Sequence, residues 1–217
     1  IGKDNIPFHT IIWPAILMAC GGLNLPYDVP ANEYLTIEGR KLSSSRNWAV
    51  WLPDYLARYD PDPLRYQLSI NMPETSDTDF SWREFVRRNN DELVATYGNL
   101  AQRALIFAYR HFDGAVPHPG TFTQTDETML ARIEKDFVKV DRLLYSCHFR
   151  EAIRTAMMLA GEANRYLEEK SPWKVIKEDR NCAATSLYVA LSVIDGLKTM
   201  LYPFIPFSSQ QLHQYLG

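Results

Sequence analysis

The chain has 217 residues, which is the length of one large domain or two small ones. Its composition, with 46% hydrophobic and 23% charged residues, is that of a globular protein and excludes a disordered or collagen-like chain. The net charge of -3 argues against a protein that coats nucleic acid through bulk positive charge, but it is compatible with a local basic groove. Because the first residue is Ile1 and not methionine, we expect the chain to start partway through a longer protein.

The longest apolar stretch, residues 11–20, falls short of the ~20 residues that a membrane helix needs, so no membrane span and no signal peptide are expected. The three cysteines, Cys20, Cys147 and Cys182, lie far apart and form no CxxC pair. This spacing predicts buried free thiols in a reducing, cytoplasmic compartment. It predicts neither a disulfide framework nor a zinc site.

The predicted elements change in character near residue 78. Before residue 78 the predicted elements are short, and glycines and prolines separate them. Glycine commonly ends a helix, and proline favours the first turn of one. Alternation around Gly39 predicts a strand or a hairpin. In chain order we expect a helix over residues 8–20, the strand or hairpin over 34–42, and helices over 53–59 and 61–69.

From Asp79 onward the chain is predicted to be almost entirely helical, because apolar residues recur at steps of three and four. Asp79 or Ser81 is expected to cap the first long helix, and Thr125 the second. Ser171 and Pro172 break the third. The expected helices cover residues 79–112, 125–144, 149–168 and 181–201, and a short one follows residue 206. This pattern predicts an antiparallel helical bundle that packs as a separate module.

A polar loop follows the predicted strand and is a candidate phosphate site. Lys41 and the hydroxyls of Ser43, Ser44 and Ser45 concentrate cationic and hydrogen-bonding groups there. Backbone amides, hydroxyls and a lysine are groups that stabilise phosphate oxygens during phosphate transfer. Polar surface loops of this composition are also ordinary connectors, so composition alone leaves both interpretations open.

The N-terminal residues have the pattern of a strand end that leads into a helix, which is where open α/β sheets bind ligands. Gly2 permits close backbone approach, and the Asp4 carboxylate can accept hydrogen bonds from ribose hydroxyls. Asp4 equally fits a helix cap. His9, near the start of an apolar helix, equally fits a packed residue whose hydrogen bonds are satisfied.

Two groups in the predicted bundle are suited to reading unpaired bases. Asn99 and Arg103 are four residues apart and project from one helix face, where an amide and a guanidinium can hydrogen-bond to base edges. Pro172 and Trp173 follow the third helix in a predicted loop, and a tryptophan held there can stack on a base. The alternative interpretations are a solvated or bridging polar pair and a tryptophan that covers the core.

Taken together, these motifs resemble the methionyl-tRNA synthetase family of class I aminoacyl-tRNA synthetases in order and spacing, over essentially the whole chain. The stretches that carry the resemblance are Gly2–Asn5, Phe8–His9, Trp13–Ala15, Glu38–Asn47, Asn99–Arg103, Ala163–Asn164 and Pro172–Trp173. The resemblance implies a mainly helical fold: an antiparallel helical bundle preceded by the end of an α/β Rossmann-type catalytic domain. The implied segments are residues 1–34, the remnant of the nucleotide-binding catalytic domain; 35–78, the connecting region with the signature loop; and 79–217, the helical anticodon-binding domain.

The resemblance implies that the first part of the chain takes part in adenylate formation. Gly2 and Asp4 match positions near the adenosine ribose of ATP, and His9 matches a residue of the methionine pocket. The positions that fall on the family's KMSKS loop, which stabilises the pyrophosphate leaving group, are Lys41, Ser43, Ser44 and Ser45. Ser44 stands where the family has its second lysine, and one lost charge of this kind can cost ~100-fold or more in rate.

The resemblance also implies that the bundle binds tRNA. Asn99, Arg103 and Trp173 match positions that recognise the CAU anticodon, and Pro172 precedes the stacking tryptophan as in the family. The complete enzyme would activate methionine with ATP and Mg²⁺ and transfer it to methionine tRNA. The family's HIGH-type motif and zinc-bearing insertion are absent from the 217 residues, so we expect the chain alone to be inactive and to hold no metal. Two alternatives stay open: a tRNA-binding paralogue without catalytic activity, which Ser44 favours, and another class I synthetase.

Overall fold

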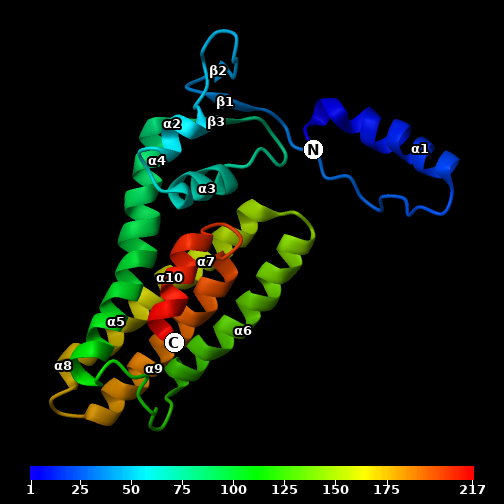
Figure 1. The fold of residues 1–217 in the computed structure, drawn as a ribbon. Coiled ribbons are helices and arrows are strands. Elements are labelled where there is room, and N and C mark those ends of the chain that lie inside the picture. The colour runs from blue at the N-terminus through cyan, green and yellow to red at the C-terminus, as the bar shows by residue number, and fades with distance from the viewer. The chain divides into compact units, whose positions relative to one another are not determined.

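The computed structural model describes residues 1–217 and is mainly helical, as predicted (Figure 1). The chain forms two compact units. The first contains Ile1–Arg58 and Asn71–Trp82, and the second contains Tyr59–Ile70 and Arg83–Gly217. The helix expected over residues 61–69 therefore belongs to the same unit as the bundle, although we expected it within the connecting region 35–78.

The first unit begins with a short 3-10 helix, Lys3–Asn5, followed by the predicted apolar helix. The apolar helix starts as a π-helical turn, Phe8–Ile12, and continues as α1, Trp13–Cys20. It ends at Gly21, whose φ of 70° lies in the left-handed region that favours glycine. The predicted helix over residues 8–20 is thus confirmed.

A small sheet with the strand order β2-β1-β3 forms the other regular part of the first unit. Its strands are β1 (Leu35–Ile37), β2 (Arg40–Lys41) and β3 (Thr78–Phe80), and the short helix α2 (Leu52–Leu56) follows β2 in the chain. β1 and β2 form the predicted antiparallel hairpin, which turns at Gly39 with a φ of 73°. β3 runs parallel to β1.

Of the two expected caps, Asp79 lies in β3 and caps no helix, whereas Ser81 stands directly before the helix that starts at Trp82. The Asp79 carboxylate instead holds the hairpin, because Oδ1 accepts hydrogen bonds from the Gly39 amide at 2.8 Å and the Thr36 hydroxyl at 2.5 Å. The long helix starts only at Trp82. Pairing with a distant strand therefore outweighs the local capping preference of an aspartate.

The second unit is the predicted helical bundle. Its elements are α3 (Pro61–Ile70), α4 (Trp82–Arg88, which starts in the first unit), the π-helix η3 (Asn89–Gly98), α5 (Asn99–His111), α6 (Gln124–Tyr145), α7 (Phe149–Lys170), α8 (Pro172–Val175), α9 (Arg180–Leu201) and α10 (Pro206–Leu216). The long helix expected over residues 79–112 is therefore made of α4, η3 and α5. It ends at His111, and Asp113 and Gly114 just beyond it both have positive φ.

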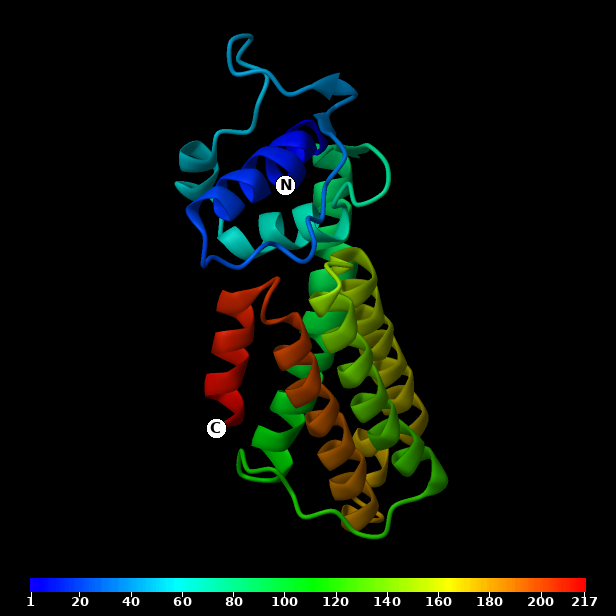
Figure 2. The ribbon, with the colours of Figure 1, turned by 90° about the vertical axis from the view of Figure 1, so that its right-hand side faces the viewer.

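The core of the bundle surrounds α9. This helix packs against α5, α6, α7 and α10, and Figure 2 shows α10 lying beside it. Its fully buried side chains include Leu187, Ile194, Leu197 and Leu201. Burial of apolar surface on this scale is what stabilises a helical bundle, since each large aliphatic side chain contributes about 1.5–3 kcal/mol.

The N-cap of α6 differs from the one we expected, and α9 has a cap that the sequence analysis did not assign. α6 is capped by Thr123 and not by Thr125, because Thr123 has an extended backbone and forms a capping box with Asp126. α9 is capped by Asp179, whose side chain accepts a hydrogen bond from the Cys182 amide at 2.9 Å. Several polar residues near each start could supply the cap, and the backbone conformation decides which one does.

The three cysteines are free thiols, but the expectation that they are buried was wrong. Cys20 is the last residue of α1, a helix without buried residues, and Cys182 lies in the exposed first turn of α9. Cys147 is half-buried in the turn between α6 and α7. In residues 1–217, no group of three or more His, Cys, Asp or Glu side chains is placed to hold a metal ion. None of the helices combines the length and hydropathy of a membrane-spanning helix.

Candidate functional site

The first candidate group lies at the N-terminal end of the first unit. Gly2 and Asp4 are exposed, and the Tyr34 hydroxyl donates a hydrogen bond to the Asp4 carboxylate at 2.6 Å. This hydrogen bond raises the pKa of Tyr34. His9 lies in the first turn of the apolar helix, where its Nδ1 is 2.9 Å from the Asn5 carbonyl oxygen. Asp4 is therefore held by a phenol, and His9 is held by a carbonyl of the 3-10 helix that precedes its own.

Tyr34 joins the N-terminal group to the loop that follows β2. The Lys41 ammonium lies 5.4 Å from the centroid of its ring and the Lys3 ammonium 4.2 Å. One aromatic side chain thus contacts two cations through its ring and Asp4 through its hydroxyl. No sequence pattern had indicated Tyr34, because these contacts come from two separate stretches of chain.

The loop with the predicted phosphate-binding groups closes on itself. Ser43 and Trp48 exchange two backbone hydrogen bonds, of 3.0 and 2.9 Å, and the Asn47 amide donates to the Ser44 carbonyl oxygen at 3.0 Å. Asn47 adopts a left-handed φ of 52°, which the turn requires. The hydroxyls of Ser43 and Ser45 are 3.2 Å apart. The tight turn therefore gathers the loop hydroxyls directly after Lys41.

Trp48 anchors this loop to the sheet. Its indole Nε1 donates to the Ile37 carbonyl oxygen at 3.0 Å, and the Arg40 guanidinium lies 4.8 Å from its ring centroid. Lys41 is exposed at the end of β2. The loop therefore presents a lysine, an arginine and several hydroxyls on a fixed base, and these are groups that bind phosphate oxygens.

The second candidate group lies in the bundle, where α5, the end of α7 and α8 meet. The Arg103 guanidinium carbon is 4.4 Å from the Trp173 ring centroid, and Nη2 of Arg103 is 2.7 Å from Oε1 of Glu168. The structure thus brings together the arginine and the tryptophan that the sequence singled out separately. Glu168 was missed, because its contact is made between helices and no local spacing indicates it.

Trp173 lies in a short helix, and our expectation of a loop was wrong. Ser171 takes the left-handed conformation that ends α7, with a φ of 40°, and Pro172 then starts α8. Proline favours the first turn of a helix because its φ is already helical. Pro172 is buried, whereas Trp173 is half-buried and packs on the core with Arg103 against its ring. The ring therefore both covers the core and contacts a charged group near the surface.

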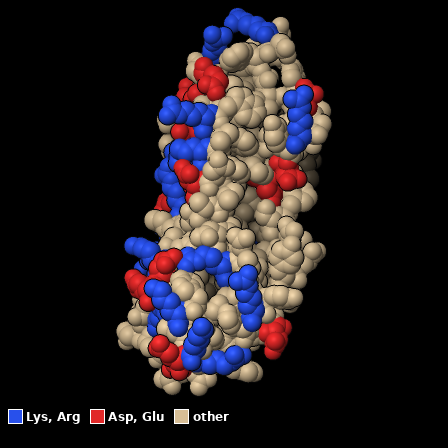
Figure 3. Space-filling model, turned by 90° about the vertical axis from the view of Figure 1, so that its left-hand side faces the viewer, with Lys and Arg blue, Asp and Glu red and all other residues tan.

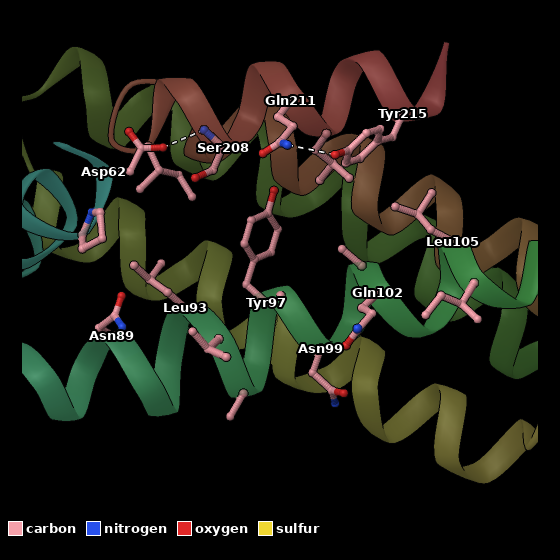
Figure 4. A pocket seen from close by; sticks show the side chains of 18 of the residues that line it. Asp62, Asn89, Leu93, Tyr97, Asn99, Gln102, Leu105, Ser208, Gln211 and Tyr215 are labelled. Atoms are coloured by element: carbon pink, nitrogen blue, oxygen red, sulfur yellow. Dashed lines mark hydrogen bonds between the residues drawn. The ribbon is translucent and has the colours of Figure 1, made fainter. Parts of the chain in front are cut away.

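Asn99 lies one turn before Arg103, but its surroundings differ. It lines a groove of about 1140 Å³ between η3 and α5 on one side and α10 on the other (Figure 4). Tyr97 reaches from η3 across this groove toward α10, where Gln211 donates a hydrogen bond to the Tyr215 hydroxyl at 2.8 Å. Asn99 and Arg103 lie four residues apart on α5, and of the two only Asn99 lines the groove.

A buried ion pair fixes the end of α7 just before Pro172. The Asp126 carboxylate, 2% exposed, accepts hydrogen bonds from the Tyr166 hydroxyl at 2.7 Å, the Thr123 amide at 2.8 Å and the Lys170 ammonium at 2.8 Å. Burial alone would raise the pKa of Asp126, but these hydrogen bonds outweigh it and lower the pKa to about 2. The first turn of α6 and the last turn of α7 are therefore joined beside the tryptophan.

Basic side chains gather around the same end of the bundle. Figure 3 shows Lys and Arg side chains over the lower end of the face that carries α5 and α8, interspersed with fewer acidic ones. The exposed basic residues of α5, α8 and the segment up to the start of α9 are Arg110, Lys174, Lys177 and Arg180. A local basic surface on a chain of negative net charge fits a confined site for a polyanion.

Comparisons with known proteins match both parts of the chain. The family model described as tRNA synthetases class I (M) matches residues 1–105, and the model described as the anticodon binding domain of methionyl tRNA ligase matches residues 116–217. The methionine–tRNA ligase of Dehalococcoides mccartyi strain BAV1 is 63% identical over 217 residues, which are 100% of this chain and 39% of that protein. The methionine–tRNA ligase of Thermomicrobium roseum is 55% identical over 218 residues, 100% of this chain and 37% of that protein.

A solved structure gives the same result. Mycobacterium tuberculosis methionyl-tRNA synthetase in complex with methionyl-adenylate superposes with a TM-score of 0.90 and 30% sequence identity, over 98% of this chain and 42% of that one. This chain therefore spans about two fifths of the length of the relatives it matches. The two family models together cover nearly all of its residues. The resemblance inferred from the motifs is thus confirmed, and the chain belongs to the methionyl-tRNA synthetase family of class I tRNA synthetases.

Proposed function

We propose that this chain is the part of a cytoplasmic methionine–tRNA ligase that holds the pyrophosphate-stabilising loop and reads the CAU anticodon of methionine tRNA. The observation that carries the proposal is the contact of Arg103 with Trp173, at 4.4 Å, beside the exposed basic surface of the bundle. An aromatic ring next to a forked donor is suited to an unpaired base, which needs a stacking partner and a hydrogen-bonding partner.

In this proposal each residue of the bundle site has a distinct role. Trp173 stacks on an anticodon base, and the buried Pro172 fixes the start of its helix. Arg103 donates to a base edge when it leaves Glu168, because a guanidinium presents several donors in one plane. Asn99 is one of the residues that line the neighbouring groove, and its side-chain amide can both donate to and accept from a second base.

The loop after β2 would act on ATP. Lys41, Ser43, Ser44 and Ser45 would contact the phosphates and stabilise the pyrophosphate that leaves when methionyl adenylate forms. Groups of this kind act on the transition state, so their loss lowers the rate more than the affinity. Mg²⁺ would enter with ATP as part of the substrate and needs no site of its own in this chain.

The N-terminal residues would contribute to the same reaction. Gly2 and Asp4 would lie near the adenosine ribose, where the Tyr34 hydroxyl orients the Asp4 carboxylate. His9 would line the methionine pocket. Since the 217 residues contain no HIGH-type motif, we expect the isolated chain to form no methionyl adenylate. Residues 1–34, 35–78 and 79–217 would be the catalytic remnant, the connecting region and the anticodon-binding domain.

The affinity for an anticodon stem-loop tests this proposal. We expect Trp173→Ala to weaken the binding of a CAU stem-loop by roughly 1–3 kcal/mol, the usual contribution of one stacked base. Trp173→Phe, which keeps an aromatic ring, serves as the matched control and should retain most of the affinity. Unchanged binding in Trp173→Ala would mean that the ring serves only the core.

Ser44 favours a second candidate function, a tRNA-binding paralogue without catalysis. The family's pattern has a lysine there, and the hydroxyl supplies no positive charge. ATP–pyrophosphate exchange separates the two functions when it is measured for the wild-type full-length protein and for its Ser44→Lys variant. A ligase should show activity that rises with the lysine, whereas no exchange in either form would leave only tRNA binding.

A further inference from the structure

The helix that carries Asn99 and Arg103 is preceded by a π-helical segment of ten residues, η3 (Asn89–Gly98). In a π-helix the amides bond to carbonyls five residues earlier, and such segments are rare and often lie at functional sites. Here the backbone amide of Asn99 bonds to the Thr96 carbonyl, three residues before it, and to the Val94 carbonyl, five residues before it. The π geometry therefore ends where the proposed reading helix begins.

The end of η3 determines the direction of the side chains that follow. Each residue that a π-turn inserts rotates all later side chains by about 100° relative to an uninterrupted α-helix. Asn99 and Arg103 lie one and five residues after the last π-helical residue, Gly98. A change in the register of η3 would therefore turn both side chains away from the groove and from Trp173.

Asn164 of α7 holds this segment from outside. Its Nδ2 donates to the Thr96 carbonyl oxygen at 2.9 Å and to the Ala160 carbonyl oxygen of its own helix at 3.1 Å. Its Oδ1 is buried without a hydrogen-bond partner. An unpaired buried polar atom opposes folding, so Oδ1 contributes nothing favourable. The Nδ2 donor is therefore the part of the Asn164 side chain that stabilises the structure. That donor is aimed at η3.

Two successive turns of α7 hold the reading helix on either side of Asn99. Asn164 and Glu168 are four residues apart and so share one face of α7. Asn164 bonds to Thr96, before Asn99, and Glu168 pairs with Arg103, after it, at 2.7 Å. The same face of α7 therefore fixes both the start of the helix and its arginine.

Gly98 gives a second, independent observation on the end of the π-helical segment η3. Its φ of -62° suits any residue, so the backbone conformation does not call for glycine. A Cβ atom there, however, would lie 3.1 Å from the Leu93 carbonyl oxygen, five residues earlier. Glycine therefore permits the close approach of that carbonyl within the π-helical segment.

We infer that Asn164 is a positioning residue for anticodon recognition: through the Thr96 carbonyl it holds the end of the π-helix, and so it sets the direction in which Asn99 and Arg103 project. The inference rests on the proposed function of the bundle site. Asn164 acts through the helix and contacts no base itself. Its loss should therefore reduce the preference for the CAU anticodon, and not only the stability of the bundle.

The test compares dissociation constants of the full-length protein for a CAU stem-loop and for stem-loops with one anticodon base changed. Asn164→Leu removes the donor at similar side-chain size, and we expect the ratio between changed and CAU stem-loops to fall about tenfold, as for the loss of one base-reading contact. Gly98→Ala should lower the ratio in the same direction. The control is Arg65→Met, which loses hydrogen bonds to the Pro203 and Phe204 carbonyls elsewhere in the bundle and should keep the ratio.

An unchanged ratio in a folded Asn164→Leu protein, or an equal loss on every stem-loop, would overturn the inference and leave Asn164 a structural role. If Asn164→Leu does not fold, Gly98→Ala decides in the same way. Wild-type protein and Trp173→Ala belong in the same series. If the wild type shows no preference for CAU, the proposed function and the inference are both refuted. If the wild type prefers CAU and the Asn164 and Gly98 variants keep that preference unchanged, the inference alone is refuted.

Discussion

The Arg103 guanidinium lies 4.4 Å from the Trp173 ring centroid and 2.7 Å from the Glu168 carboxylate. A cation–π contact at an exposed site contributes about 0.5–1 kcal/mol, and an exposed ion pair contributes about 0–1 kcal/mol. Both contacts are weak enough for an RNA base to replace. The arginine is thus held close to the tryptophan and remains able to exchange its partners.

Glu168→Gln should change RNA binding without changing stability much. The substitution removes the charge that competes for Arg103 and repels phosphates, so we expect tighter binding of all stem-loops and a smaller preference for CAU. The free energy of unfolding should change by less than about 1 kcal/mol, because the Glu168 side chain is exposed. Dissociation constants for CAU and altered stem-loops, with urea unfolding, measure both effects. Glu169→Gln, which removes the same charge one residue further, is the control; an identical change in both variants would contradict a specific role of Glu168.

Asp126→Asn should destabilise the bundle by roughly 1–2 kcal/mol at pH 7. The pKa of Asp126 is about 2 in the folded chain, below its ordinary value of 3.8, so the ionised carboxylate stabilises the folded state at pH values above about 4. This contribution is lost as the pH falls from about 4 to about 2. Urea unfolding of both proteins between pH 2 and 7 should therefore show a difference that disappears at low pH. A difference that does not depend on pH would contradict the account of the ion pair.

Two helical glycines should respond in opposite ways to alanine. A Cβ at Gly196 of α9 would lie 2.7 Å from the Cγ2 atom of Ile133 on α6, so Gly196→Ala should destabilise the fold by about 1–3 kcal/mol through overpacking. At Gly161 of α7 no atom lies within 4 Å of the added Cβ, and Gly161→Ala should stabilise the helix by about 0.4–1 kcal/mol. Thermal unfolding measures both. Equal effects of the two substitutions would contradict the packing of α6 against α9.

The helices and the hairpin could be predicted from the sequence because their signals are local. Apolar spacing located the long helices, and alternation around Gly39 located the hairpin. β3 was missed, since three residues that pair with a distant strand carry no periodic pattern of their own. The π-helical segment could not be foreseen either, because its apolar residues have the same spacing as those of an α-helix.

Single residues of the candidate site could be predicted from the sequence, but their contacts with one another could not. Arg103 and Trp173 were each recognisable as base-reading side chains, but their contact depends on how α5 packs beside α8. Glu168 and Asn164 act across helices, so no spacing within one helix reveals their roles. Tyr34 is a similar case in the first unit, where it contacts Asp4 and Lys41 from a position between them in sequence.

The discrimination of Arg103→Ala between anticodons tests the central claim most directly. Dissociation constants are measured for CAU and for stem-loops changed at one anticodon base, with wild-type and Arg103→Ala protein. If Arg103 reads a base edge, the variant should lose about 1–3 kcal/mol on CAU and much less on the stem-loops changed at the base that it reads. An equal loss on every stem-loop would show that Arg103 contacts phosphate, and it would contradict anticodon reading at this site.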